Sequence, residues 1–265
     1  VLCTSLLAQP LSASDNKSVA KEDTLWIRNG DRHLFGLISR PQYVQGKMPV
    51  AIIAHGFNGT HHFGRNYFET LNKLGYQVYT FDFACGSVNS RSDNNTMNMS
   101  ILDECSDLKT VVEHFRSRPD VDPDGIVLLG ESQGGLISAL VASEMPDAVD
   151  KLILIFPAFC IPDNWNQRYP DVTEIPDTTW LWDVPLGKRF FQEIRDMDVF
   201  GGMEQFDDPV LIVQGDKDPI VSIEDSRRAV GLYEDAHLHV IPGAGHGFNP
   251  DEFAESLEQI RMFLD

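Results

Sequence analysis

Basic residues are scarce in this sequence. The 265 residues include 21 Lys and Arg against 40 Asp and Glu, which gives a formal net charge of −19 at pH 7. A surface with this surplus of negative charge repels phosphate backbones and anionic lipid headgroups. We therefore expect neither nucleic acid nor an anionic membrane surface as a partner.

Cysteine is also scarce, and its spacing excludes common metal sites. Cys3, Cys85, Cys105 and Cys160 show no CxxC spacing and no matched histidine pair, so a structural metal site is not expected. Buried free thiols are the expectation. If the protein is exported, a disulfide from Cys85 to either Cys105 or Cys160 stays open, because sequence alone cannot settle pairing.

The sequence lacks a hydrophobic run long enough to span a membrane. The first thirteen residues carry no charge, but a spanning helix needs about 20 apolar residues. This stretch resembles the back half of a secretory signal without its basic start. For residues 1–20 we keep two interpretations open: a signal-like segment of a periplasmic or secreted protein, or a disordered N-terminus of a cytoplasmic one.

What is present is typical of a soluble globular protein. Hydrophobic residues make up 42% and charged residues 23% of the chain, enough to bury a full core in one large domain. After a hairpin at 25–40, strand and helix patterns alternate, and several strand patterns are apolar throughout. Strands of that kind are buried on both faces, which predicts an α/β fold with a doubly wound, mainly parallel sheet.

The expected elements follow from periodicity and from helix-capping residues. Ser100 and Asp103 form a capping box, and the helix after them places Ile101, Leu102 and Cys105 on one apolar face. The predicted strands cover 49–54, 77–83, 125–130, 151–156, 210–213 and 238–241, and the predicted helices cover 67–74, 100–115, 134–145, 223–233 and 251–264.

One connection is too long for a plain crossover. About fifty residues separate the strand ending near 156 from the strand starting near 209, roughly twice what a crossover uses. The segment holds three of the four tryptophans, Trp165, Trp180 and Trp182. We predict a substrate cap at about 159–205; a structural subdomain whose aromatic side chains pack on one another is the alternative.

The sharpest motif is Gly130-Glu131-Ser132-Gln133-Gly134, which follows an apolar strand and precedes a helical pattern. Its glycines allow a tight strand-to-helix turn that holds the serine in strained geometry, with its hydroxyl exposed above the sheet. We interpret it as a nucleophile elbow, with Ser132 as the nucleophile.

A serine hydroxyl needs a base to remove its proton. Among eight histidines, His246 lies in the glycine-rich loop between the last strand and the last helix, a position that can reach the elbow. The carboxylate that orients this histidine should lie between Ser132 and His246 in the sequence. Asp216 and Asp218 follow a strand in that interval; we choose Asp218 and expect Asp216 to cap the turn.

The oxyanion that forms when the serine attacks needs N–H donors. One is the amide of Gln133, the residue after the nucleophile. The Phe57 amide, in the loop His55-Gly56-Phe57 after an early strand, is the candidate for the second, with a plain turn as the alternative.

These motifs, in this order, resemble the α/β-hydrolase superfamily, from about residue 25 to the end. Within it the chain is most similar to bacterial cinnamoyl (feruloyl) esterases, which carry an HGF-type loop and a GxSQGG elbow. The resemblance implies a single α/β-hydrolase domain over 21–265 with a cap inserted after the sixth strand, and a pocket for an aromatic acyl group lined by Trp182. Glu131, where histidine is common, and Cys85-Gly86, in place of a glycine-histidine-glycine stretch, depart from the pattern.

The sequence thus predicts a serine carboxylic-ester hydrolase that acts on a small-molecule ester, a hydroxycinnamate of plant cell-wall origin being the leading substrate. It implies no metal and no organic cofactor, and the oligomeric state stays open. A short-chain acyl esterase, a serine peptidase of the prolyl-oligopeptidase type and a non-catalytic binding protein on the same fold are the alternatives.

Overall fold

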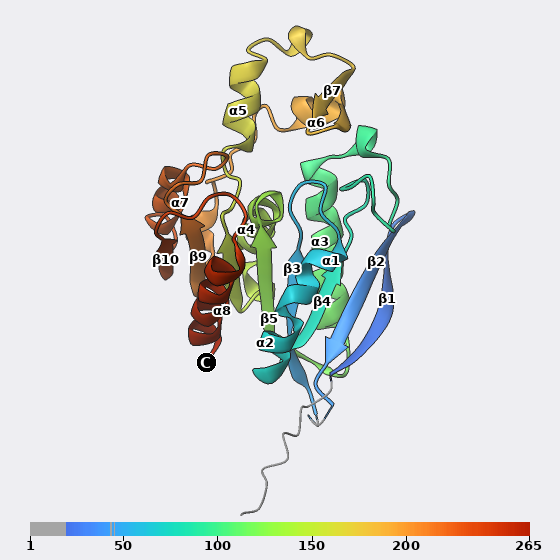
Figure 1. Cartoon of the computed structure of the whole chain (residues 1–265). Helices are drawn as coiled ribbons and strands as arrows, with labels where there is room; N and C mark the ends of the chain where they lie inside the picture. The colour runs from blue at the N-terminus through green and yellow to red at the C-terminus, as the bar shows by residue number, and fades with distance from the viewer. Residues whose placement is uncertain (1–19, 43, 45) are drawn as a thin grey trace, which may run out of the picture.

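The computed structural model describes residues 20–42, 44 and 46–265. The signal-like or disordered segment predicted at 1–20 lies, except for its last residue, outside the described residues. Figure 1 shows one central sheet with helices packed on both faces, and an aromatic-rich segment standing above one end of it.

The sheet has eight strands in the order β1-β2-β4-β3-β5-β6-β9-β10. The pairs β1–β2 and β2–β4 are antiparallel and all the others are parallel, so the predicted mainly parallel sheet with an N-terminal hairpin is confirmed. The strands are β1 (Lys21–Asn29), β2 (Arg32–Arg40), β3 (Met48–Ala54), β4 (Gln77–Phe81), β5 (Val121–Glu131), β6 (Lys151–Ile155), β9 (Val210–Gly215) and β10 (Ala236–Ile241).

The helices lie where strand-to-strand crossovers require them. They are α1 (His61–Gly64), α2 (Phe68–Lys73), α3 (Ile101–Arg116), α4 (Gln133–Glu144), α5 (Ile161–Arg168), α6 (Lys188–Glu193), α7 (Ile223–Val230) and α8 (Pro250–Leu264), with short 3₁₀ turns at Arg65–Tyr67, Thr96–Asn98, Pro146–Ala148, Val172–Glu174 and Met203–Gln205. The predicted helices correspond to α2, α3, α4, α7 and α8, and their ends differ from the predicted ones by a few residues. The helices α1, α5 and α6 were not predicted.

Two apolar cores form because successive strand residues point to opposite faces. In β5, Ile126 and Leu128 join the core under α3, α4 and α7, whereas Val127 and Leu129 join the core under α2 and α8. All four side chains are fully buried. This two-sided burial explains the continuous apolar strand patterns and makes the sheet doubly wound, as predicted.

One face of α3 differs from the prediction. Leu102, expected on the apolar face, is 51% exposed, while Glu104 is 1% exposed and Asp107 is fully buried. Residues one position apart on a helix point about 100° away from each other, so Leu102 cannot share the face of Ile101. The buried carboxyl groups take part in polar contacts beside the candidate site.

The segment 159–205, called here the insertion, lies between β6 and β9. It contains α5, α6 and a second, two-stranded antiparallel sheet of β7 (Thr178–Leu181) and β8 (Val184–Gly187). Figure 1 places α5, β7 and α6 above the end of the sheet at which the parallel strands terminate. The aromatic side chains of the insertion pack on one another. The Trp165 and Phe191 rings meet edge to face, with their centroids 4.7 Å apart.

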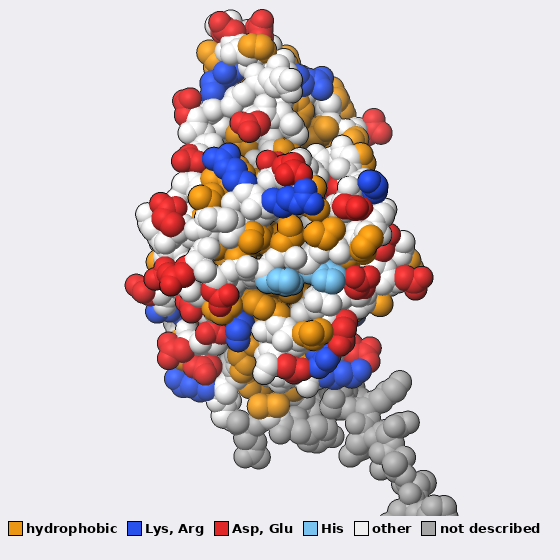
Figure 2. Space-filling view, turned by 90° about the vertical axis from the view of Figure 1, so that its left-hand side faces the viewer, with side chains coloured by type: hydrophobic (Ala, Val, Ile, Leu, Met, Phe, Trp, Pro, Cys, Tyr) orange, Lys and Arg blue, Asp and Glu red, His pale blue; other side chains and the backbone are white. Residues whose placement is uncertain are grey.

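The surface carries its negative charge in many places. Figure 2 shows acidic side chains spread over the face it displays, with basic and hydrophobic ones between them. Among the described residues, no helix combines the length and apolarity that crossing a bilayer requires. The three cysteines in the described part of the chain, Cys85, Cys105 and Cys160, are unpaired.

Candidate active site

Ser132 lies at a strained turn between β5 and α4. Its backbone has φ 52° and ψ −118°, a conformation that non-glycine residues rarely adopt. The turn closes only because Gly130 and Gly134 lack side chains: a Cβ on either would come within 2.3 Å of a backbone oxygen. The local sequence therefore produces the sharp strand-to-helix turn that the motif predicts and lifts the Ser132 hydroxyl above the sheet.

His246 reaches this hydroxyl from the loop between β10 and α8. Its Nε2 lies 3.0 Å from Ser132 Oγ, and its Nδ1 lies 2.8 Å from Asp218 Oδ2. Because a carboxylate only accepts hydrogen bonds, Nδ1 carries the ring proton and donates a hydrogen bond to Asp218, which leaves Nε2 free to accept the serine proton.

Asp218, in the loop after β9, is held as a carboxylate. Its side chain is 1% exposed, and its Oδ1 accepts hydrogen bonds from the amides of Ile220 (2.8 Å) and Val221 (2.9 Å). Burial alone would raise the pKa of Asp218, but the hydrogen bonds from His246 and from these two amides lower that pKa below its usual value. Asp218 thus stays charged beside His246.

Asp216 has a different contact. Its Oδ1 accepts a hydrogen bond from the Gly243 amide at 2.6 Å, and among the described contacts none joins it to the His246 ring. It joins the β9 loop to the loop that carries His246. Of the two aspartates that the sequence offers, Asp218 is therefore the one in contact with the histidine.

The two candidate oxyanion donors lie on either side of Ser132. Gln133 is the first residue of α4, so its amide has no acceptor within the helix. Phe57 follows Gly56, which lies close to Ser132. A Cβ added to Gly56 would come within 3.1 Å of the Ser132 side chain. Both amides are thus beside the serine, where negative charge would develop.

His55 fixes the peptide group that carries the Phe57 amide. The Phe83 amide donates to His55 Nε2 at 3.1 Å, so the proton of His55 is on Nδ1, which donates to the Gly56 carbonyl at 2.8 Å. The Gly59 amide donates to the same carbonyl at 2.9 Å. Within one trans peptide the C=O and N–H point in opposite directions, so holding the Gly56 carbonyl sets the direction of the Phe57 N–H.

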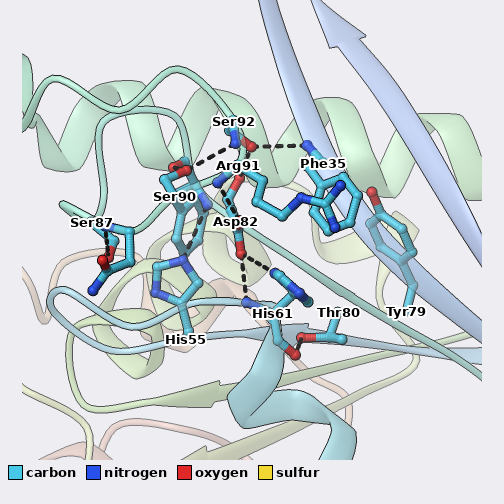
Figure 3. Close-up of polar contacts among 12 residues, drawn as sticks. Phe35, His55, His61, Tyr79, Thr80, Asp82, Ser87, Ser90, Arg91 and Ser92 are labelled. Carbon is cyan, nitrogen blue, oxygen red and sulfur yellow. Dashed lines mark hydrogen bonds and ion pairs between the residues drawn. The ribbon is translucent and has the colours of Figure 1, made fainter.

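The far end of the same loop is held by a buried aspartate. Asp82, just after β4, accepts hydrogen bonds from the His61 amide at 2.6 Å, from His61 Nδ1 at 2.7 Å and from the Arg91 amide at 2.7 Å (Figure 3). Asp82 is fully buried and His61 is 3% exposed. These contacts tie the start of α1 to the end of β4. Both ends of the loop at 55–60, called here the oxyanion loop after its predicted role, are thus anchored in the core.

Glu104 of α3 contacts Gln133, the residue that carries the other candidate oxyanion donor. Its Oε2 accepts a hydrogen bond from the Gln133 side chain at 2.8 Å, and its Oε1 has no partner among the described residues. Burial raises the pKa of Glu104 to about 8, against the hydrogen bond from Gln133, which lowers it. The group is therefore neutral at pH 7.

Trp182 stands at the tip of the β7–β8 hairpin, above Ser132. Trp182 and Asp183 form its two-residue turn with φ 47° and 63°, the positive values that a tight hairpin needs and that glycine or asparagine usually supply. The Trp182 indole is 63% exposed and meets the Phe57 ring edge to face at 5.8 Å.

Two cavities open at Ser132. The insertion-side pocket, about 310 Å³, lies under the insertion, and the helix-side pocket, about 660 Å³, lies between the oxyanion loop and the start of α8. Ser132, Phe57 and Trp182 line both pockets, so the two cavities meet at the serine. Among the described residues, no group of three or more His, Cys, Asp or Glu side chains is arranged to hold a metal ion.

Three residues beside the site were not assigned a role from the sequence: His55 and His61, which had little sequence signal, and Glu104. His55 and His61 looked like polar loop residues, and nothing local reveals their partners, which lie 28 and 21 residues away. Glu104 had a signal that could have been used: a charged residue four positions before Leu108, on the buried face of a helix.

The arrangement as a whole is that of an α/β-hydrolase. The family model described as serine aminopeptidase, S33 matches residues 47–182, about half of the chain, and the chain belongs to this family. Its fold is confirmed by a solved structure, Est1E from Butyrivibrio proteoclasticus with ferulic acid bound, at a TM-score of 0.83 and 26% identity over 91% of this chain and 97% of that one.

Two curated relatives are similar to the chain at comparable sequence identity. A sn-1-specific diacylglycerol lipase ABHD11 from Xenopus laevis is 23% identical over 82% of this chain and 80% of its own length. A pimeloyl-[acyl-carrier protein] methyl ester esterase from Sodalis glossinidius is 26% identical over 57% of this chain and 74% of its own. Together these findings confirm the resemblance to the superfamily and make the chain an esterase-type hydrolase.

Proposed function

We propose that the chain is a serine carboxylic-ester hydrolase that works through an acyl-enzyme on hydroxycinnamoyl esters such as ferulates. One observation carries the proposal: the hydrogen-bonded series Ser132, His246 and Asp218 opens into an aromatic pocket beneath the insertion. A serine, an imidazole and a carboxylate in this geometry generate a nucleophile at neutral pH.

The first half of the reaction forms the acyl-enzyme. Ser132 Oγ attacks the ester carbonyl carbon while His246 Nε2 takes the hydroxyl proton, and Asp218 stabilises the imidazolium that results. The carbonyl oxygen becomes an oxyanion between the amides of Phe57 and Gln133. When the tetrahedral intermediate collapses, His246 gives its proton to the departing alcohol oxygen.

The second half repeats these steps with water. His246 removes a proton from a water molecule, which attacks the acyl carbon; the proton then returns to Ser132 Oγ as the free acid leaves. Because the amide of Gln133 belongs to the first turn of α4, the positive end of the helix dipole adds to the stabilisation of the oxyanion.

The insertion supplies the acyl pocket and acts as a substrate cap. Aromatic side chains of the insertion, Trp165, Trp182 and Phe190, form much of the wall of the insertion-side pocket, with Ile161 and Val221 beside them. Flat apolar walls suit a planar aromatic acyl group, which gains both from burial and from ring-to-ring contacts. The ferulic acid held by the similar Est1E supports the same substrate class.

The family description favours a peptidase as the second candidate. An aminopeptidase needs a charged carboxylate to pair with the free amino group of its substrate. Glu131 is the carboxyl group beside Ser132 in the helix-side pocket, but burial raises the pKa of Glu131 well above its usual value. A carboxyl group whose burial disfavours the charged form is a poor partner for an ammonium group, so we rank the peptidase below the esterase.

The test is a comparison of kcat/KM for methyl ferulate, 4-nitrophenyl acetate and a proline-containing peptide amide, with Ser132→Ala as the blank. We expect a clear preference for the ferulate and a loss on the order of 10⁵ or more in the blank. A preference for acetate would reduce the activity to a short-chain esterase. Turnover of the peptide alone would establish a peptidase, and turnover of none of the three would favour a binding protein.

A further inference from the structure

The two pockets at Ser132 differ in which catalytic residue they adjoin. Only one of them adjoins His246, which donates the proton to the departing alcohol. His246 lines the helix-side pocket, whereas Gln133, an oxyanion donor, lines the insertion-side pocket. In ester cleavage the imidazole must hand its proton to the departing alcohol oxygen. The alcohol half of the ester therefore lies on the His246 side, in the helix-side pocket, and the acyl half extends beneath the insertion.

The helix-side pocket is built mainly from phenylalanine. Phe63 comes from α1, Phe156 from the end of β6, Phe248 from the His246 loop and Phe253 from α8. The Phe156 ring meets the Phe248 ring edge to face at 4.9 Å. Rings from four separate elements thus enclose the space next to the histidine, and none of the described residues lining it is a lysine or arginine.

The polar groups of this pocket are few. The ring nitrogens of His55 are already used, Nε2 by the Phe83 amide and Nδ1 by the Gly56 carbonyl. That leaves mainly Asn66 and Glu131 to bind hydroxyl groups. A sugar, with a hydroxyl on nearly every carbon, would lose hydration at most of these groups without replacement, which is costly.

We propose that the helix-side pocket is the alcohol subsite and that it selects an uncharged, apolar alcohol, either aryl-methyl or a longer alkyl, over a sugar. The inference rests on the proposed esterase function and makes its substrate an ester with an apolar group on both sides. Glu131 offers one hydrogen-bonding group at the wall of the subsite, and burial raises its pKa well above the usual value.

The test uses one acyl group with different alcohols. The acyl-enzyme is then the same for every substrate, so differences in kcat/KM arise in binding and acylation, where the alcohol is still present. We expect kcat/KM for benzyl ferulate to exceed that for methyl ferulate and for a glucose ferulate by about 10-fold or more, as burial of a phenyl ring would give.

Two variants on α8 locate the effect. Phe253→Ala removes a wall of the subsite and should lower the benzyl-to-methyl ratio about 10-fold. Leu257→Ala, one turn further along the same helix and outside both pockets, is the matched control and should keep the ratio. Melting temperatures of both variants show whether either loss comes from unfolding.

A second readout follows the alcohol in the reverse direction. With methyl ferulate as donor, added benzyl alcohol should attack the acyl-enzyme. His246 takes the proton of the benzyl alcohol hydroxyl while the alcohol oxygen bonds to the acyl carbon; the bond from the acyl carbon to Ser132 Oγ then breaks, and His246 returns the proton to Ser132 Oγ. We expect benzyl ferulate to form in preference to glucose ferulate at equal alcohol concentrations, and this preference should fall in Phe253→Ala.

Several outcomes would overturn the inference. Equal kcat/KM for the benzyl and methyl esters, or a preference for the glucose ester or for a choline ester, would each contradict an uncharged apolar subsite. If no ferulate is cleaved but acetates are, the proposed acyl specificity is wrong, and benzyl acetate against methyl acetate then tests the subsite by itself. A chain that cleaves none of these esters overturns both proposals.

Discussion

At the scale of single residues, the two aspartates after β9 have separate tasks. Asp218 accepts from His246, and Asp216 accepts from the Gly243 amide in the loop that carries His246. We expect Asp218→Asn to lower kcat by about 10⁴-fold, because an amide stabilises the wrong tautomer of the imidazole. Asp216→Asn, the matched control, should cost less than about 10-fold. Steady-state measurement of kcat for both variants on one ester tests this prediction. A larger loss of kcat in Asp216→Asn than in Asp218→Asn would contradict these roles.

Glu104 makes a residue-scale prediction about stability. Burial raises its pKa to about 8, so between about pH 5 and pH 8 the folded chain binds a proton that the unfolded chain has released. The stability that this proton contributes is full below the unfolded pKa and is lost as pH rises to about 8. Relative to Glu104→Gln, the wild-type free energy of unfolding should fall by up to about 1.4 kcal/mol per pH unit over this range. Urea unfolding at each pH measures it; parallel curves would refute a neutral Glu104.

At the scale of elements, the β7–β8 hairpin is expected to set acyl selectivity. Trp182 lines both pockets at its tip, whereas Trp180 on the same hairpin is 65% exposed and lines neither. Trp182→Ala should lower kcat/KM for methyl ferulate about 10-fold more than for methyl acetate, since an aromatic acyl group loses a ring contact that acetate never makes. Trp180→Ala should leave that ratio unchanged. A ratio that responds to both variants alike would point to a general effect of the hairpin.

The elements also show where the sequence is informative. The turn at Ser132 was predictable because glycines at fixed offsets determine its local geometry, and the loops holding Asp218 and His246 follow from strand order. The hairpin Thr178–Gly187 was not predictable. Its turn holds Trp182 and Asp183 at positive φ, whereas glycine or asparagine usually occupies such positions and marks the turn in the sequence. The contacts of His55 depend on residues brought close only by folding. The sequence thus predicts the loops that meet at Ser132, and the catalytic roles of their residues stay a prediction.

At the scale of the whole molecule, the net charge of −19 should influence which esters arrive at the site. Carboxylates are spread over the surface (Figure 2). The described lining of the helix-side pocket holds no lysine or arginine, and that of the insertion-side pocket holds one basic residue, Arg168. The resulting field repels anionic substrates and is screened over about 10 Å at 0.1 M salt. For a ferulate ester whose alcohol carries a carboxylate, kcat/KM should therefore rise about 2- to 5-fold between 10 and 200 mM NaCl, while the neutral methyl ester should change little. Equal salt responses of the two esters would mean that the field does not extend into the pockets.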